Sequence, residues 1–85
     1  MTRKQRNALR ANLAVTINSR TEVEVYIADG DTGRADFDAT EAAMEEVSAL
    51  LGWGGYRTGY GSWVLRSDYA PCSEDFNSTA SRYHY

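Results

Sequence analysis

The segment that most constrains the fold is an amphipathic stretch with a helix signal at each end, residues 38–52. Asp38 can accept hydrogen bonds from the first free backbone amides of a helix, and Glu41, three residues later, completes a capping box. Gly52 stands where a left-handed C-terminal cap belongs. Apolar side chains recur between these ends at helical spacing: Ala43, Met44, Val47, Leu50 and Leu51. The pattern predicts a helix over about 39–51 whose apolar face packs on another layer.

The segment TEVEVYIAD, residues 21–29, has the alternation of a strand. Val23, Val25 and Ile27 fall on one face, and the residues between them fall on the other. The turn signal DGDTG follows, and RADF, residues 34–37, has the pattern of a short returning strand. We therefore predict a hairpin over this region.

The start of the chain allows two interpretations. Leu9, Leu13 and Ile17 are spaced for a helix, whereas Leu13, Val15 and Ile17 are spaced for a strand. We favour a short basic helix over about 3–10 followed by a strand over about 13–18, because β-branched residues prefer strands. A single helix to residue 18 is the alternative.

The glycine-rich and aromatic stretch GWGGYRTGYGSWVLR, residues 52–66, predicts a hairpin. Residues 62–66 have the pattern of a strand that can pair with residues 56–58 across a glycine-flanked turn. A phosphate-binding loop needs glycines after a strand and before a helix, and the order here is the reverse. At least one of Trp53 and Trp63 should lie in the core, since so small a domain needs the apolar area.

Together these patterns predict a single α+β domain over residues 1–71, a small antiparallel sheet with the main helix packed on one face. Val25 and Val47 should both be buried. Residues 72–85 lack apolar periodicity and should form a loosely ordered tail. No apolar run approaches the roughly 20 residues that span a bilayer, and the basic N-terminus lacks the apolar core of a signal peptide. We therefore expect a cytoplasmic protein of a bacterial host cell, with no membrane contact.

Residues for catalysis or metal binding are scarce. The only histidine, His84, and the only cysteine, Cys72, fall in the expected tail, and no base–nucleophile pair is visible. DGDTGRADFD lacks the ligands that a calcium loop needs at positions 5 and 12 and the glycine that it needs at position 6. We expect no enzymatic activity, no metal and no cofactor.

Binding residues are more evident. The first 20 residues hold five bases and no acid, whereas residues 21–50 hold nine acids against Arg34. Aromatic and arginine side chains of the kind that anchor interfaces cluster after Gly52. We predict a partner-binding surface made of an aromatic patch and an adjoining acidic patch: Tyr56, Arg57, Tyr60 and Arg66, with Asp29, Asp31, Glu45 and Glu46.

The segment TGRADFDATEAAMEEVSALLGWGG, residues 32–55, resembles a piece of small phage-borne anti-CRISPR proteins that bind type I surveillance complexes. The shared features are an acidic–aromatic–acidic step, a capped helix and a glycine-containing break, and they fall here on Asp36, Phe37, Asp38, Thr40 and Glu41. The resemblance covers less than a third of the chain and leaves out the aromatic hairpin. It implies a small α+β inhibitor that occludes a surface of a larger protein or RNA–protein complex.

Two classes of function follow. The favoured one is a non-catalytic, protein-binding inhibitor with a larger host protein or RNA–protein complex, such as a CRISPR effector, as its partner. The alternative is a small nucleic-acid-binding protein that uses the basic N-terminus and the aromatic hairpin. The net charge of −3 argues against the alternative, because nonspecific affinity for phosphates depends on positive charge.

Overall fold

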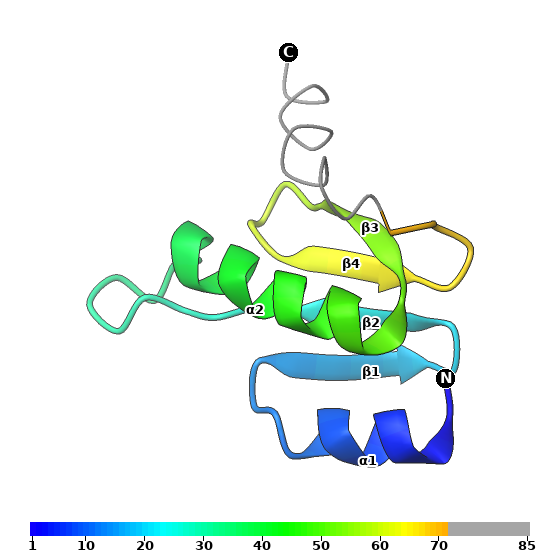
Figure 1. The fold of residues 1–85 in the computed structure, drawn as a ribbon. Helices are drawn as coiled ribbons and strands as arrows, with labels where there is room; N and C mark the ends of the chain where they lie inside the picture. Colours follow the sequence, from blue (N-terminus) through cyan, green and yellow to red (C-terminus); the bar gives the residue numbers. More distant parts are fainter. Residues whose placement is uncertain (72–85) are drawn as a thin grey trace.

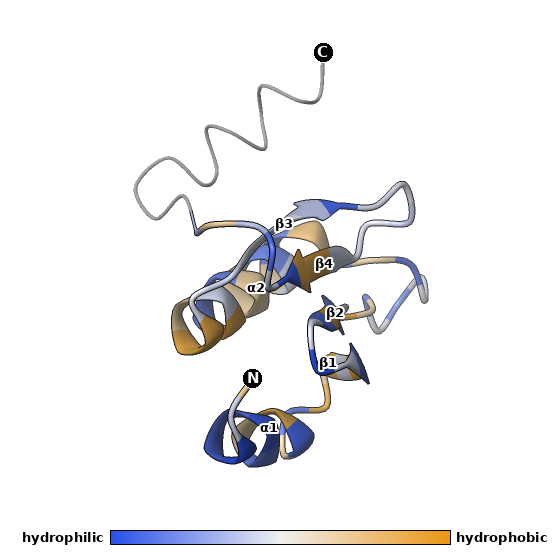
Figure 2. Cartoon of the chain, turned by 90° about the vertical axis from the view of Figure 1, so that its right-hand side faces the viewer, coloured by the Kyte–Doolittle hydropathy of each residue, from blue (hydrophilic) through white to orange (hydrophobic). Residues whose placement is uncertain are grey.

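The computed structural model describes residues 1–71. Its elements, in chain order, are α1 (Arg3–Arg10), β1 (Val15–Ser19), β2 (Glu22–Val25), α2 (Phe37–Leu51), β3 (Gly54–Arg57) and β4 (Trp63–Arg66). The strands form an antiparallel sheet in the order β1-β2-β4-β3, and both helices lie on one face of it (Figures 1 and 2). The predicted α+β class is therefore confirmed. The predicted tail, residues 72–85, lies outside the described residues.

Strand β4 occupies the centre of the sheet. It pairs with β2, where Trp63 stands opposite Val25, and with β3, where Trp63 stands opposite Arg57. The predicted strand over 62–66 and its pairing with the segment after Gly55 are both confirmed.

The start of the chain forms a helix and then a strand, as favoured. The side chain of Thr2 caps α1 in a reciprocal capping box with Gln5. Asn12 ends the helical region, because its side chain accepts a hydrogen bond from the Ala14 amide and its carbonyl accepts one from the Val15 amide. Leu13, which fitted both patterns, lies in this turn and is fully exposed.

Helix α2 begins two residues earlier than predicted. Asp36, not Asp38, is the N-cap, and its carboxylate accepts a hydrogen bond of 3.0 Å from the Ala39 amide. The reason is tertiary: the Asp36 amide donates to the Ile27 carbonyl, which holds Asp36 in the extended conformation that a cap requires. Gly52 is the C-cap with a φ of 72°, as predicted.

The predicted hairpin between residues 22 and 37 is present only in part: the chain turns back, but the predicted strand over 34–37 is absent. RADF forms no strand, but it pairs with the preceding segment through one antiparallel bridge, Ala28–Ala35, and through hydrogen bonds from the Asp29 amide to the Arg34 carbonyl and from the Asp36 amide to the Ile27 carbonyl. Both edges of β2 are already occupied, one by β1 and the other by β4. The segment over 34–37 therefore pairs only with residues 27–29, beyond the end of β2.

The core lies between the sheet and the two helices. It contains Val23 and Val25 of β2, Trp63 and Leu65 of β4, and buried side chains from both helices: Leu9, Met44, Val47 and Leu51. Val25, Val47 and both tryptophans are buried, as predicted. Leu50 departs from the predicted apolar stripe, since it is 44% exposed.

Thr40 joins α2 to the end of β2. Its buried hydroxyl accepts a hydrogen bond from the Ile27 amide and donates one to the Ile27 carbonyl, at 3.1 and 3.2 Å. In the part of the chain that the structure describes, the other face of the sheet carries no helix (Figure 2). Among residues 1–71, neither helix has the length and apolar character needed to cross a membrane.

Candidate partner-binding site

A groove of about 700 Å³ lies between the β3–β4 turn and the segment before α2. We call it the aromatic groove, and define it by its lining: Glu24, Tyr26, Arg34, Ala35, Phe37, Gly59, Tyr60 and Ser62. Three of these side chains are aromatic and open to solvent, with exposed fractions of 90% for Tyr60, 54% for Phe37 and 36% for Tyr26. The groove therefore presents apolar area that the fold itself does not use.

The β3–β4 turn holds Tyr60 at the rim of the groove. The Gly61 amide donates to the Thr58 carbonyl at 3.1 Å, and the Thr58 amide donates to the Ser62 carbonyl at 2.8 Å. The hydroxyl groups of Thr58 and Ser62 are also hydrogen-bonded, at 2.7 Å. These bonds fix the turn backbone and leave the Tyr60 ring directed away from the core.

Gly61 allows the β3–β4 turn to lie against Ala35 and Phe37, on the other side of the groove. Its φ is 87°, in the left-handed region that favours glycine. A Cβ atom at this position would stand 2.6 Å from the Cβ of Ala35 and 3.0 Å from the Phe37 ring. A larger residue would force the two walls apart.

The loop over residues 29–34 ends at Arg34, which lines the groove. Hydrogen bonds to its own side chains stabilise this loop. Asp29 accepts a hydrogen bond of 2.7 Å from the Asp31 amide, and the Asp29 amide donates to the Arg34 carbonyl. Asp29 therefore stabilises the loop, while Asp31 extends the acidic character of this rim as an exposed carboxylate.

Arg57 packs against Phe37, one of the rings that line the groove. Its guanidinium carbon lies 4.8 Å from the centroid of the Phe37 ring and 5.4 Å from that of Trp63, within the range of cation–π attraction. Its Nε atom is buried and has no hydrogen-bond partner among residues 1–71. Arg57 therefore belongs to the packing that positions Phe37, rather than to the exposed surface.

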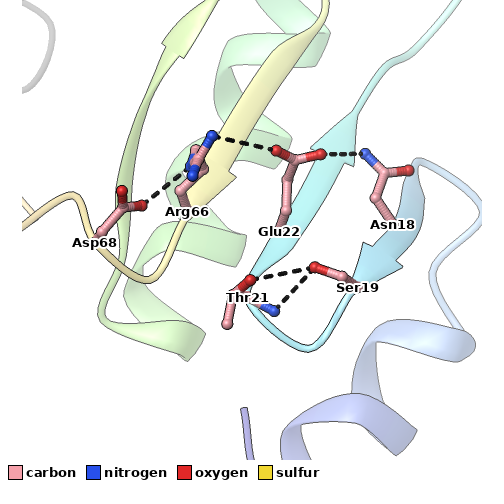
Figure 3. Close-up of polar contacts among 6 residues, drawn as sticks. All are labelled: Asn18, Ser19, Thr21, Glu22, Arg66 and Asp68. Carbon is pink, nitrogen blue, oxygen red and sulfur yellow. Dashed lines mark hydrogen bonds and ion pairs between the residues drawn. The ribbon is translucent and has the colours of Figure 1, made fainter.

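Tyr56 and Arg66 lie on the face of the sheet opposite α1 and α2. Tyr56 packs edge to face on Tyr69, with 5.8 Å between ring centroids. Arg66 Nε contacts Asp68 at 3.0 Å and its Nη1 lies 3.8 Å from Glu22 (Figure 3). The hydrogen bond and charge of Asp68, with a smaller contribution from Glu22, raise the pKa of Arg66 above its ordinary value.

Glu45 and Glu46 are exposed on α2, which covers the opposite face of the sheet from Tyr56 and Arg66. The eight predicted residues therefore do not form one surface. Only Tyr60 lines the aromatic groove. Asp29 and Asp31 belong to the loop that leads to Arg34, and Arg57 contacts Phe37. Tyr56 and Arg66 lie on the face of the sheet opposite the helices, and Glu45 and Glu46 lie on α2.

Tyr60 is the one predicted site residue that lines the groove, and the lining side chains that sequence reasoning missed include Glu24, Tyr26, Arg34 and Phe37. One signal was present: Tyr26 places a large ring on the polar face of the alternating strand pattern. The place of Phe37 in the groove was not predicted, because RADF has the pattern of a strand and not of the first residues of a helix.

Comparisons of the chain with models of protein families, with curated proteins and with solved structures gave no match. Within residues 1–71, no group of three or more histidine, cysteine, aspartate and glutamate side chains is placed to hold a metal ion.

Proposed function

We propose that the protein is a non-catalytic, protein-binding inhibitor, and that the aromatic groove is its partner-binding surface. The observation that carries the proposal is the exposure of three rings, Tyr26, Phe37 and Tyr60, around one groove. Tyrosine and phenylalanine supply much of the binding energy at protein interfaces, because each buries a large apolar area. The hydrogen-bonded turn beneath Tyr60 reduces the conformational entropy lost on binding.

The charges near the groove indicate what kind of partner surface would complement it. Glu24 lines the groove beside Arg34, and the adjoining loop carries Asp29 and Asp31. The partner surface that complements this arrangement has an apolar side chain flanked by basic residues. A protein surface that normally holds nucleic acid has this character, and covering it would block nucleic-acid binding without any chemistry.

The resemblance of residues 32–55 to anti-CRISPR proteins makes a type I surveillance complex the first partner to test. A purified complex would be mixed with increasing amounts of the protein, and the binding of labelled target DNA would be measured. We expect DNA binding to fall as the protein is added. Unchanged DNA binding at saturating protein would rule out this partner.

A matched pair of variants tests the groove. Tyr60→Ser removes the most exposed ring of the groove, whereas Tyr69→Ser removes a tyrosine that is 43% exposed outside the groove lining. Loss of an anchor of about 2 kcal/mol raises the inhibitory concentration roughly 30-fold. We expect this shift for Tyr60→Ser and wild-type inhibition for Tyr69→Ser. Equal inhibition by both variants would place the interface elsewhere.

A further inference from the structure

A second surface lies at the other end of the sheet. The first turn of α1 and the β1–β2 turn enclose a cleft of about 190 Å³, lined by Arg3, Arg6 and Arg20 together with Met1, Thr2, Ile17 and Ser19. We call it the basic cleft. The Met1 nitrogen donates a hydrogen bond of 3.1 Å to the Arg20 carbonyl, which brings the two segments together. No acidic residue lines the cleft.

The three arginines of the basic cleft are not neutralised within the fold. All three are exposed, and none forms an ion pair within residues 1–71, where Arg66 holds the ion pairs. The nearest acid in the sequence, Glu22, is bonded to Asn18 and Arg66 on the opposite face of the sheet (Figure 3).

Helix α1 adds to the positive potential of the basic cleft. The N-terminal end of a helix carries a partial positive charge, and its first turn usually holds acids. The first turn of α1 holds no acid, and it begins with Arg3 and Lys4. Backbone amides at this end also lack intrahelical acceptors, and the capping box satisfies only those of Thr2 and Gln5. This departure from the normal charge pattern is unfavourable in the absence of an anion.

One compensating contact exists, but it is small. Gln5 Nε2 donates to the Leu50 carbonyl, which places the negative end of α2 near the start of α1. That end is equivalent to about half an elementary charge, whereas three arginines surround the cleft. Lys4 and Arg10, both exposed, continue the positive charge along the helix, over a length of about 12 Å.

We propose that the basic cleft binds the phosphate backbone of a single-stranded nucleic acid, and that Lys4 and Arg10, which do not line the cleft, add only long-range attraction. The narrow cleft receives the backbone of one strand, and arginine forks and helix-terminal amides are the groups that bind phosphate oxygens best. The chain of positive charge along α1 favours a polymer over an isolated phosphate.

This inference goes beyond the proposed function and does not depend on it. The β1–β2 turn lies at the end of the sheet where Glu22 stands opposite Arg66, and the β3–β4 turn lies beyond Trp63 at the other end (Figure 1). The basic N-terminus and the aromatic hairpin therefore do not form one nucleic-acid surface. An RNA–protein complex could instead contact the aromatic groove with its protein and the basic cleft with its RNA.

The test is the salt dependence of RNA binding, measured by fluorescence anisotropy with a short labelled single-stranded RNA at increasing KCl concentrations. Arg6→Gln/Arg20→Gln removes two charges from the basic cleft. Lys4→Gln/Arg10→Gln removes two charges from α1 outside the cleft lining, and so matches the change in net charge. Circular dichroism checks that both variants keep the wild-type fold.

Each phosphate contact on a single strand contributes about 0.7 to the slope of log affinity against log salt. We therefore expect the cleft variant to lower the slope by about 1.4 and the matched control to lower it less. Tyr60→Ser should bind RNA as the wild type does, which separates this inference from the proposed function.

Three outcomes would overturn the inference. The first is no RNA binding by the wild type at low salt. The second is an equal loss in both double variants, which would indicate diffuse charge attraction without a site. The third is binding of a labelled poly-glutamate peptide as tightly as RNA with the same dependence on Arg6 and Arg20, which would indicate an acidic protein surface as the ligand.

Discussion

The guanidinium of Arg57 lies 4.8 Å from the centroid of the Phe37 ring, and this contact joins the edge strand β3 to the first turn of α2. It also fixes one ring of the aromatic groove. Arg57, which the sequence predicted to contact a partner, therefore packs against Phe37 and holds that ring in place.

Replacement of Arg57 tests this role. Arg57→Ala should lower the free energy of unfolding by about 1–2 kcal/mol, because it removes the cation–π contacts and the packing of the aliphatic stem. Arg57→Lys should lose less than Arg57→Ala, because it keeps the charge and most of the stem while losing the planar group. Urea unfolding followed by tryptophan fluorescence measures both, and a wild-type midpoint for Arg57→Ala would show that the contact contributes nothing.

Two glycines of the β3–β4 turn should respond in opposite ways to alanine. Gly61→Ala should destabilise the protein by about 1–3 kcal/mol, because a side chain at a φ of 87° is strained and its Cβ would meet Ala35. Gly59→Ala should be neutral or slightly stabilising, because its Cβ would enter open space. Thermal unfolding compares the two, and equal melting temperatures would contradict the packing of the turn on Ala35.

The hydroxyl of Thr40 should matter more than its methyl group. Thr40→Val leaves the Ile27 amide without its partner in the core and should cost about 1–3 kcal/mol. Thr40→Ser keeps the hydroxyl and should cost less. Denaturant unfolding of both variants gives the comparison, and a larger loss for serine than for valine would show that packing dominates at this position.

Two positions of α2 that lie three residues apart should differ sharply in their contribution to stability. Val47→Ala removes buried methyl groups from the core and should cost about 1–3 kcal/mol. Leu50→Ala removes a larger side chain that is 44% exposed, and it should cost less than Val47→Ala. If Leu50→Ala proves the more destabilising, α2 packs on the sheet through a different face.

Glu45 and Glu46 lie on the exposed side of α2, away from the aromatic groove. Reversing both to lysine should lower the association rate with a basic partner and flatten its dependence on salt, because rim charges act mainly by steering. The dissociation rate should stay at the wild-type value. Surface plasmon resonance on the identified partner separates the two rates, and a faster dissociation would place these residues inside the interface.

The sequence predicted the parts of the fold that depend on local signals. The alternation around Val23 and Val25 and the cap at Gly52 each report a backbone preference within a few residues, and each was confirmed. The N-cap of α2 and the RADF segment were mispredicted. Both depend on how residues 34–36 meet residues 27–29 after β2 has ended, and that contact is set by the folded chain and not by local sequence.

The candidate site was less predictable for the same reason. Tyr60 stood out as part of an aromatic turn, but its neighbours Tyr26 and Phe37 come from other segments that meet only in the folded chain. Charge and residue type indicated that Arg57, Arg66 and Tyr56 were contact residues. The structure gives each an intramolecular partner that spacing in the sequence does not reveal.

The central place of β4 has a consequence for how the chain acquires its fold during synthesis. Within residues 1–71, β4 is the last strand to leave the ribosome, and β2 and β3 are joined only through it. Until Arg66 has emerged, the nascent chain can form the β1–β2 hairpin and α2 but cannot close the sheet, so Val23 and Val25 stay in contact with water. The sheet therefore closes only after β4 has emerged, and until then the open edge of β2 is the point at which a stalled chain would aggregate.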